Sequence, residues 1–137
     1  MGCGLMVNDS KGKGWFILEL YTPIQFNGDS ILNSVKKYLG MTEDYTHFDL
    51  DLIIHINSVF MILNQLGIGP VNGFEIENEL ATWDEFVNNN EYIDDIKNYV
   101  CLRVRLLFDP PSGFTVIESI NRTINRLEWN LVSMSEQ

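Results

Sequence analysis

The stretch that decides the fold is VRLLFDPPSGFTVIESINRTINRLEWNL, residues 104–131. Its first part ends an apolar helix, because a helix must stop before Pro110. Asp109, Pro110 and Pro111 predict a stiff hinge, since two prolines fix φ and remove two N–H donors. The residues from Thr115 onward predict a long last helix. Its apolar residues recur every three or four positions, as in a seam packed on another helix: Ile117, Ile120, Ile124, Leu127 and Leu131.

The opposite side of this last helix carries a tryptophan. At 100° per residue, Trp129 lies about 170° from the centre of the seam, and Glu118, Arg122 and Arg126 share its side. Tryptophan together with arginine is the mixture enriched at binding hot spots. We expect this face to bind a partner protein. The alternative is that loops or an arm of the same chain cover the indole.

An earlier segment, FDLDLIIHINSVFMILNQLG, predicts a second long helix with Asp49 as its N-cap and Gly67 as its stop. One stripe of it is the expected core face: Leu52, Ile56, Val59, Leu63 and Leu66. Ile54 and Met61 are seven residues apart and lie on the opposite side. Two interpretations remain open for this pair, a second packing layer of the same domain or a contact between subunits.

Residues 92–108 predict the central helix, because their apolar sector is broad. The expected buried residues are Ile93, Ile96, Val100, Val104 and Leu107. Arg103 falls within that sector, and a buried arginine needs a partner. Either its stem packs while its head reaches solvent, or it forms a structural ion pair with a carboxylate across the turn, such as Asp109 or Glu118.

The remaining segments complete the expected fold. A short helix runs from Asp29 or Ser30 as N-cap to Gly40, and residues 74–83 predict a short strand or hairpin. Thr82 with Glu85, and Thr115 with Glu118, match the capping-box pattern that opens a helix.

Residues 1–28 are rich in aromatic and β-branched residues and contain Pro23, so they predict a strand-forming arm. The expected fold is mainly α: a small bundle of four to five helices over residues 29–137, with a long C-terminal helix and an N-terminal extended or β arm.

Composition narrows the function classes. The chain has 137 residues and a net charge of −10, so its surface should repel nucleic-acid phosphates. No segment reaches the ~20 apolar residues of a membrane span, and no signal-peptide pattern is found. Cys3 and Cys101 are expected to be free thiols in a reducing compartment, with Cys101 acting as a small buried side chain. We expect a protein of the cytoplasm, or of a particle assembled there.

The sequence holds no catalytic or metal-binding set. The two histidines, His47 and His55, lack the spacing of a metal pair and are expected to be structural. No phosphate loop, nucleophile elbow or cysteine–histidine pairing can be placed. We therefore expect no enzyme activity, no metal and no cofactor.

Several segments together resemble a known family. SVKKYLGMTEDYTHFDLDLIIHINSVFMILNQLGIGP, TWDEF, IKNYVCLRVRLLFDPP and VIESINRTINRLEWNL are similar, in order and spacing, to the head–tail connector (adaptor or head-completion) proteins of tailed phages and prophages of Gram-positive bacteria. The resemblance covers about Asp29 to Leu131 and leaves out residues 1–28.

The resemblance implies a mostly helical, non-enzymatic subunit of the phage neck. Such subunits form a ring, usually a dodecamer, which docks on the portal protein, extends the DNA channel and receives the next connector or a tail-terminator protein. It also implies that the last helix, with Trp129, Arg122 and Arg126 outermost, engages the portal or a neighbouring copy. The expected location is the virion, and the host cytoplasm during assembly, without membrane contact or specific DNA binding.

Two other hypotheses stand beside this one. A monomeric regulatory or inhibitor-type module would use the same helix face on another protein. A small hydrolase would need a pocket with convergent titratable groups.

Overall fold

The computed structural model describes residues 6–10, 12–16, 30–87 and 92–136. This part of the chain holds five helices: α1 (Ile31–Tyr38), α2 (Asp49–Gln65), α3 (Trp83–Phe86), α4 (Ile93–Phe108) and α5 (Phe114–Ser135). The expected mainly helical fold with a long last helix is confirmed. None of these helices is both long enough and apolar enough to cross a membrane.

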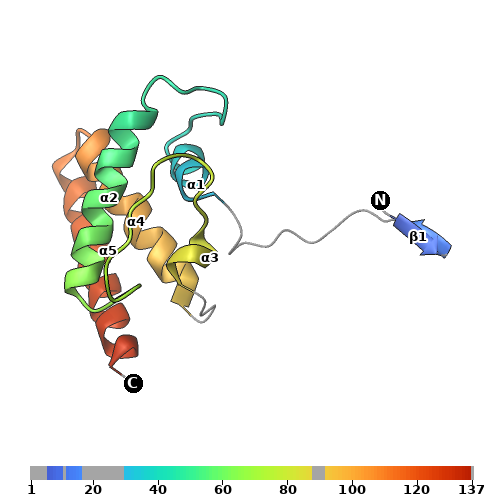
Figure 1. Ribbon diagram of the computed structural model, residues 1–137. Helices are drawn as coiled ribbons and strands as arrows, with labels where there is room; N and C mark the ends of the chain where they lie inside the picture. The colour runs from blue at the N-terminus through green and yellow to red at the C-terminus, as the bar shows by residue number, and fades with distance from the viewer. Residues whose placement is uncertain (1–5, 11, 17–29, 88–91, 137) are drawn as a thin grey trace.

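Helix α4 is the centre of the bundle, as its broad apolar sector predicts. It packs on both α2 and α5, and α1 contacts α2 and α4 (Figure 1). The rings of Phe48 and Phe108 lie 5.2 Å apart, so the start of α2 meets the end of α4 and the two helices are antiparallel. Their buried residues form one continuous core with Ile31, Trp83 and Leu131.

Local signals set most helix boundaries. The Ser30 hydroxyl accepts a hydrogen bond from the Asn33 N–H and caps α1, and the capping box of Thr82 and Glu85 opens α3. Two expected caps are wrong. Phe48, not Asp49, precedes α2, and α5 begins at Phe114 after Gly113, without a side-chain cap from Thr115.

Asp49 forms an ion pair with a buried lysine instead of capping α2. The Lys36 side chain is 1% exposed, and its Nζ lies 2.9 Å from Asp49 Oδ1 and donates to the Glu43 carbonyl oxygen. A charge removed from water needs such partners. Lys36 therefore ties α1, the start of α2 and the loop between them together.

The strand or hairpin expected over residues 74–83 is wrong, since α3 begins at Trp83 and the residues before it form no strand. The side chain of Asn57 accepts from the Ile76 N–H at 2.8 Å and donates to the Ile76 carbonyl at 3.0 Å. These bonds satisfy the backbone groups that a neighbouring strand would otherwise pair. The segment crosses α2 as an extended loop, and Thr82 forms a single bridge to Ser30.

Within the predicted arm, β1 (Met6–Ser10) and β2 (Gly12–Phe16) pair antiparallel. The remaining residues of the arm lie outside the described residues, so the strand-forming arm of residues 1–28 stays a prediction.

Candidate protein–protein interface

Helix α5 presents a polar and aromatic face away from the core. We call Glu118, Arg122, Arg126 and Trp129 the α5 outer face. All four side chains are exposed, and Trp129 is 72% exposed, so no described loop covers the indole. Arg122 and Arg126 form no ion pair within the described part of the chain. The opposite side of α5 buries Ile124, Leu127 and Leu131, while Ile117 and Ile120 are half-buried.

A hydrogen-bonded cluster between α4 and α5 sets the rotation of α5. The carboxylate of Glu128 accepts from the Tyr99 hydroxyl at 2.5 Å and from Arg103 Nη2 at 2.6 Å, and Arg103 Nε donates to the Tyr99 oxygen at 2.8 Å. Glu128 is thereby held against α4. Because the next residue lies 100° further around the helix, Trp129 points away from the bundle.

The cluster also shifts two titration equilibria. Burial, together with the hydrogen bond to Glu128, raises the pKa of Tyr99, so this phenol stays protonated. Burial acts to raise the pKa of Glu128 as well, but the hydrogen bonds from Tyr99 and Arg103 outweigh it and leave the pKa lowered. Glu128 is therefore an anion at neutral pH, paired with the Arg103 cation.

Arg103 has a different partner from the ones named from the sequence. The expected carboxylates were Asp109 or Glu118, but Glu128 forms the ion pair. Arg103 lies more than one turn before the end of α4, and an antiparallel α5 brings a later residue beside it. The ion pair joins α4 and α5 well away from the loop of residues 109–113 that connects them.

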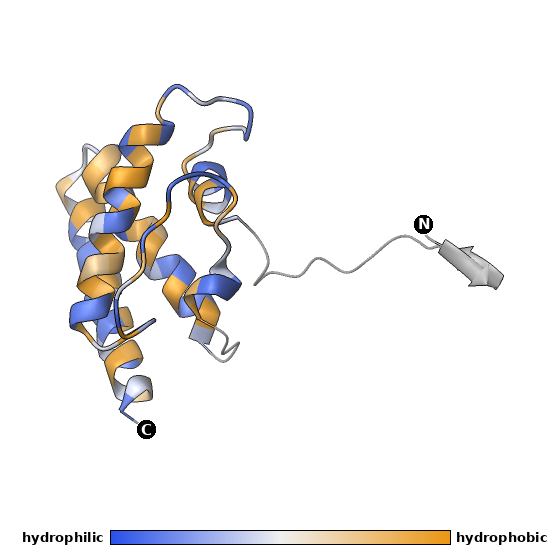
Figure 2. Cartoon of the chain, in the orientation of Figure 1, coloured by the Kyte–Doolittle hydropathy of each residue, from blue (hydrophilic) through white to orange (hydrophobic). Residues whose placement is uncertain are grey.

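Helix α2 also carries apolar residues on its solvent side. Leu50 is 76% exposed, Ile54 62% and Met61 60%, and we call these three the α2 outer face. Figure 2 shows hydrophobic and hydrophilic segments alternating along α2. No described element forms a second layer over Ile54 and Met61. Leu50, four residues before Ile54, was missed, although its helical position places it on the same side.

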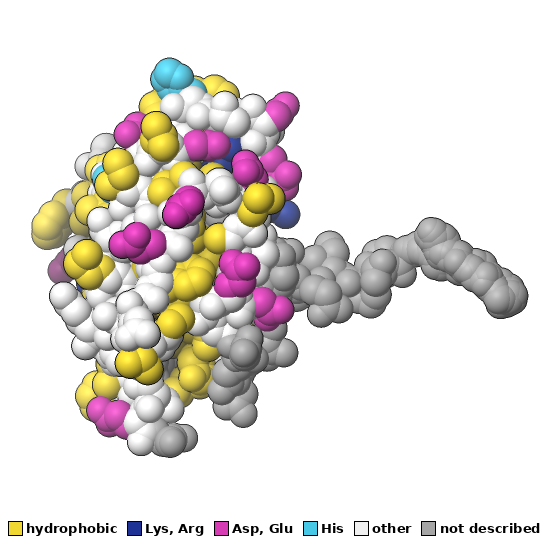
Figure 3. Space-filling view, viewed as in Figure 1, with side chains coloured by type: hydrophobic (Ala, Val, Ile, Leu, Met, Phe, Trp, Pro, Cys, Tyr) yellow, Lys and Arg dark blue, Asp and Glu magenta, His cyan; other side chains and the backbone are white. Residues whose placement is uncertain are grey.

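A hollow lies beside the α2 outer face. Its volume is about 420 Å³, and Met61 and Asn64 of α2 line it together with Asn72, Phe74 and Glu75 of the following loop. Figure 3, with α2 in front, shows acidic side chains spread among hydrophobic ones and few basic side chains. This region therefore combines apolar contact area with negative charge.

A third exposed apolar group surrounds the elbow between α4 and α5. Leu107, Phe114 and Val116 are exposed, and we call them the elbow surface. The expectation that Leu107 is buried is wrong, because Leu107 lies in the last turn of α4, next to the loop that joins α4 to α5 at the end of the bundle. The hinge residues Asp109, Pro110 and Pro111 lie between the two helices, and Asp109 and Pro110 are exposed.

The described residues provide little for chemistry. None of their His, Cys, Asp and Glu side chains gather in threes as a metal site would require. Burial raises the pKa of Cys101 to about 12, so its thiol is protonated. His47 and His55 pack against Phe48 and Phe108.

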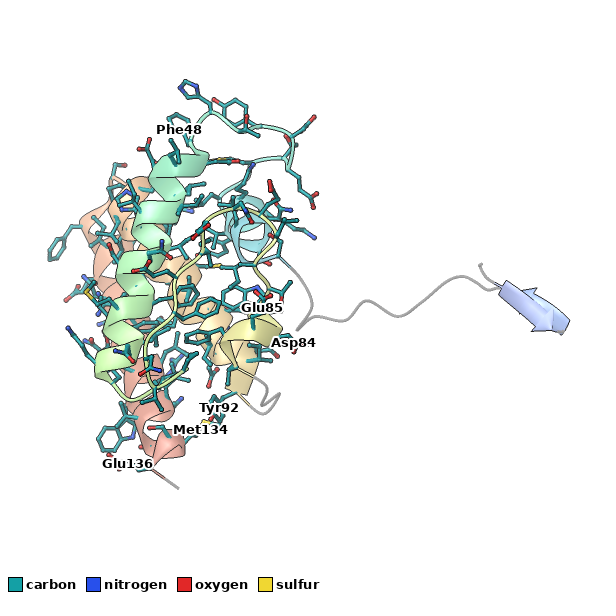
Figure 4. All side chains as sticks on the ribbon, in the orientation of Figure 1. Phe48, Asp84, Glu85, Tyr92, Met134 and Glu136 are labelled. Atoms are coloured by element: carbon teal, nitrogen blue, oxygen red, sulfur yellow. The ribbon has the colours of Figure 1, made fainter. Side chains whose placement is uncertain are left out.

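A second hollow, of about 440 Å³, lies at the end of the bundle opposite the elbow. Asp84, Glu85 and Tyr92 line it, and Figure 4 labels all three. The Glu85 carboxylate already accepts from the Thr82 N–H in the capping box. No convergent catalytic group follows from this lining.

The fold and these surfaces define a mainly helical protein with exposed apolar faces, of the kind found in assemblies. The chain belongs to the family of phage connector proteins, whose model matches residues 31–137. Membership implies a structural role in the phage particle, in contact with other head or tail proteins. The chain has no match among curated proteins or solved structures.

Proposed function

We propose that this chain is a ring-forming subunit of the phage neck, which docks on the portal protein and extends the DNA channel toward the tail. The observation that carries the proposal is the exposed apolar area on two different helices of the matched domain, the α2 outer face and Trp129 of the α5 outer face. Exposed apolar residues that gather in one patch mark contact sites, and Leu50, Ile54 and Met61 gather on one side of α2.

A ring needs contact surfaces on its sides and at its ends. The α2 and α5 outer faces run along the bundle, whereas the elbow surface lies at one end of it. We assign the two long faces to contacts within the ring. We assign the elbow surface, with Phe114 78% exposed, to the portal or to the next neck protein, because the hinge prolines hold it with little entropy to lose on binding.

The charge of the chain suits a channel for DNA. A net charge of −10 opposes binding to the phosphate backbone, so DNA passes without being held. The copy number we expect is twelve, and the location is the neck of the virion, after assembly in the host cytoplasm. The other partners we expect are the next connector or a tail-terminator protein.

We also propose that residues 1–28 act as an arm, separate from the helical domain of residues 29–137, which adds a strand to an adjacent subunit or ring. Deletion of residues 1–26 should weaken assembly while the circular dichroism and melting temperature of the helical domain stay unchanged. Loss of the helical signal in the truncated chain would show that the arm belongs to the domain.

The mass of the native complex tests the ring directly. We expect native mass spectrometry of the purified protein, alone and with its portal protein, to give a closed oligomer, and electron microscopy to show it in the neck of particles. A chain that stays monomeric under both conditions, and is absent from particles, refutes the proposal.

That result would favour the second candidate, a monomeric regulatory module. The observation behind it is the same exposed Trp129 beside two unpaired arginines, which also suits a one-to-one complex. The two candidates differ in whether the particle contains the protein.

A further inference from the structure

The α5 outer face and the region around the α2 hollow are complementary in charge. Within residues 30–87 and 92–136 only three Lys or Arg side chains are exposed, and two of them, Arg122 and Arg126, lie one turn apart on α5. The hollow is bordered by Glu75, and Glu77 and Glu79 follow on the same loop, all three of them exposed. A chain with nineteen acidic and nine basic residues thus places a basic patch on one helix and an acidic patch beside another.

The two regions also match in the groups that an indole requires. Trp129 offers a large apolar ring with one N–H donor, and such a ring is most favourable in a pocket that supplies both apolar contact and an acceptor. The α2 hollow has Met61 and Phe74 as apolar lining, and Asn64, Asn72 and Glu75 as sources of acceptor oxygens. Its volume of about 420 Å³ lies within the range of sites that enclose organic groups.

The α5 outer face and the region around the α2 hollow belong to different helices of one chain and differ in their residues. A contact between two different faces of identical subunits is head-to-tail, and repetition of it gives a ring when the rotation closes. The same contact brings opposite charges together, although two copies with a net charge of −10 repel each other overall.

We propose that Trp129 of one copy inserts into the α2 hollow of the next copy, beside Met61, while Arg122 and Arg126 lie against the acidic loop of Glu75 and Glu77. This pairing rests on the proposed ring and specifies which faces form it. Ile54 and Leu50 extend the apolar contact along α2.

Disulfide crosslinking tests the pairing. The chain is prepared with Cys3→Ser, and its other cysteine, Cys101, is buried and protonated. Because Trp129→Cys loses the indole contact, oxidation is carried out at a protein concentration more than roughly 30-fold above the one at which the wild-type chain associates. Under these conditions we expect Trp129→Cys combined with Met61→Cys to give a ladder of covalent multimers up to the size of the ring. Each single variant should give no ladder, and neither should Trp129→Cys combined with Lys37→Cys, an exposed position on α1.

Charge reversal provides a second test of the same contact. Arg122→Glu with Arg126→Glu should weaken association at least roughly 30-fold, as loss of a hot spot does. Adding Glu75→Arg and Glu77→Arg to that variant should restore most of the association. Circular dichroism of each variant establishes that the helices remain folded.

The outcomes separate the pairing from the ring. A closed ring of the wild-type chain with neither ladder nor charge rescue overturns the pairing and leaves the proposed function standing. Crosslinks from Trp129→Cys to the portal protein alone would also overturn the pairing. A wild-type chain that forms no ring in isolation, with the portal or in particles overturns both.

Discussion

Replacing Trp129 with alanine should separate assembly from folding. Less than a third of the side chain is covered within its own copy, because the indole is 72% exposed. A covered tryptophan buries about 200 Å², so at about 25 cal/mol per Å² the covered share contributes at most about 1.4 kcal/mol to folding. Alanine, the better helix former, returns about 0.5 kcal/mol, and we expect the free energy of unfolding to fall by about 1 kcal/mol.

The loss in assembly should be larger. If a neighbouring copy covers the remaining surface, the contact is worth up to about 3.6 kcal/mol by the same area estimate. A loss of about 2 kcal/mol or more per contact weakens association by roughly 30-fold or more. Sedimentation over a concentration series measures this association, and urea unfolding of the dilute protein measures stability.

Leu131 is the matched control on the same helix. Its side chain is fully buried, so Leu131→Ala should lower the free energy of unfolding by about 2–5 kcal/mol. The reasoning fails if Trp129→Ala lowers the free energy of unfolding as much as Leu131→Ala does, or if it leaves the association constant unchanged from that of the wild type.

Three further predictions concern the fold. Glu128→Gln should lower the free energy of unfolding at neutral pH by about 1 kcal/mol, a value reduced by partial solvent screening. Because the pKa of Glu128 is lowered in the folded state, the stabilisation from this carboxylate is complete above the ordinary pKa of 4.5 and disappears as the pH falls through the lowered pKa. Urea titrations of the wild type and the variant should therefore give the same free energy of unfolding at low pH. A difference that stays constant with pH would exclude the ion pair as the cause of the lost stability. Lys36→Met removes a fully buried cation from Asp49 and should lower the free energy of unfolding by about 3 kcal/mol. Lys37→Met, at an exposed neighbouring site, should change the free energy of unfolding by less than about 0.5 kcal/mol. Equal urea midpoints for the two variants would contradict this prediction. Gly69→Ala should lower the melting temperature more than Gly40→Ala. Both glycines have positive φ, so each change costs about 1 kcal/mol, but only at position 69 does the added Cβ fall 2.5 Å from the Phe86 ring. Equal losses of melting temperature would show that the Phe86 ring moves aside freely.

The helices and their core faces were predictable because they depend on short-range patterns. Capping at Ser30 and Thr82, the stop at Gly67 and the two prolines after Asp109 are each read within a few residues of sequence. The exposure of Trp129 was likewise indicated by helical periodicity alone.

Contacts between distant residues were not predictable in this way. The strand expected over 74–83 does not form. The side chain of Asn57, on α2, instead makes the hydrogen bonds to the Ile76 N–H and C=O that a neighbouring strand would make. The partner of Arg103 depended on how far α5 runs back along α4, and Lys36 gives no sign in the sequence that it is buried.

The sequence by itself determined where the helices lie, which side of each is apolar, and that the last one carries an indole among arginines. Only the tertiary structure decided which charges are neutralised within the chain and which remain free for a partner. The physical reason is that periodicity reports direction around one helix axis, whereas pairing depends on the separation of groups on different helices. Arg103 forms an ion pair with Glu128 of the same chain, whereas Arg122 and Arg126 remain exposed beside Trp129.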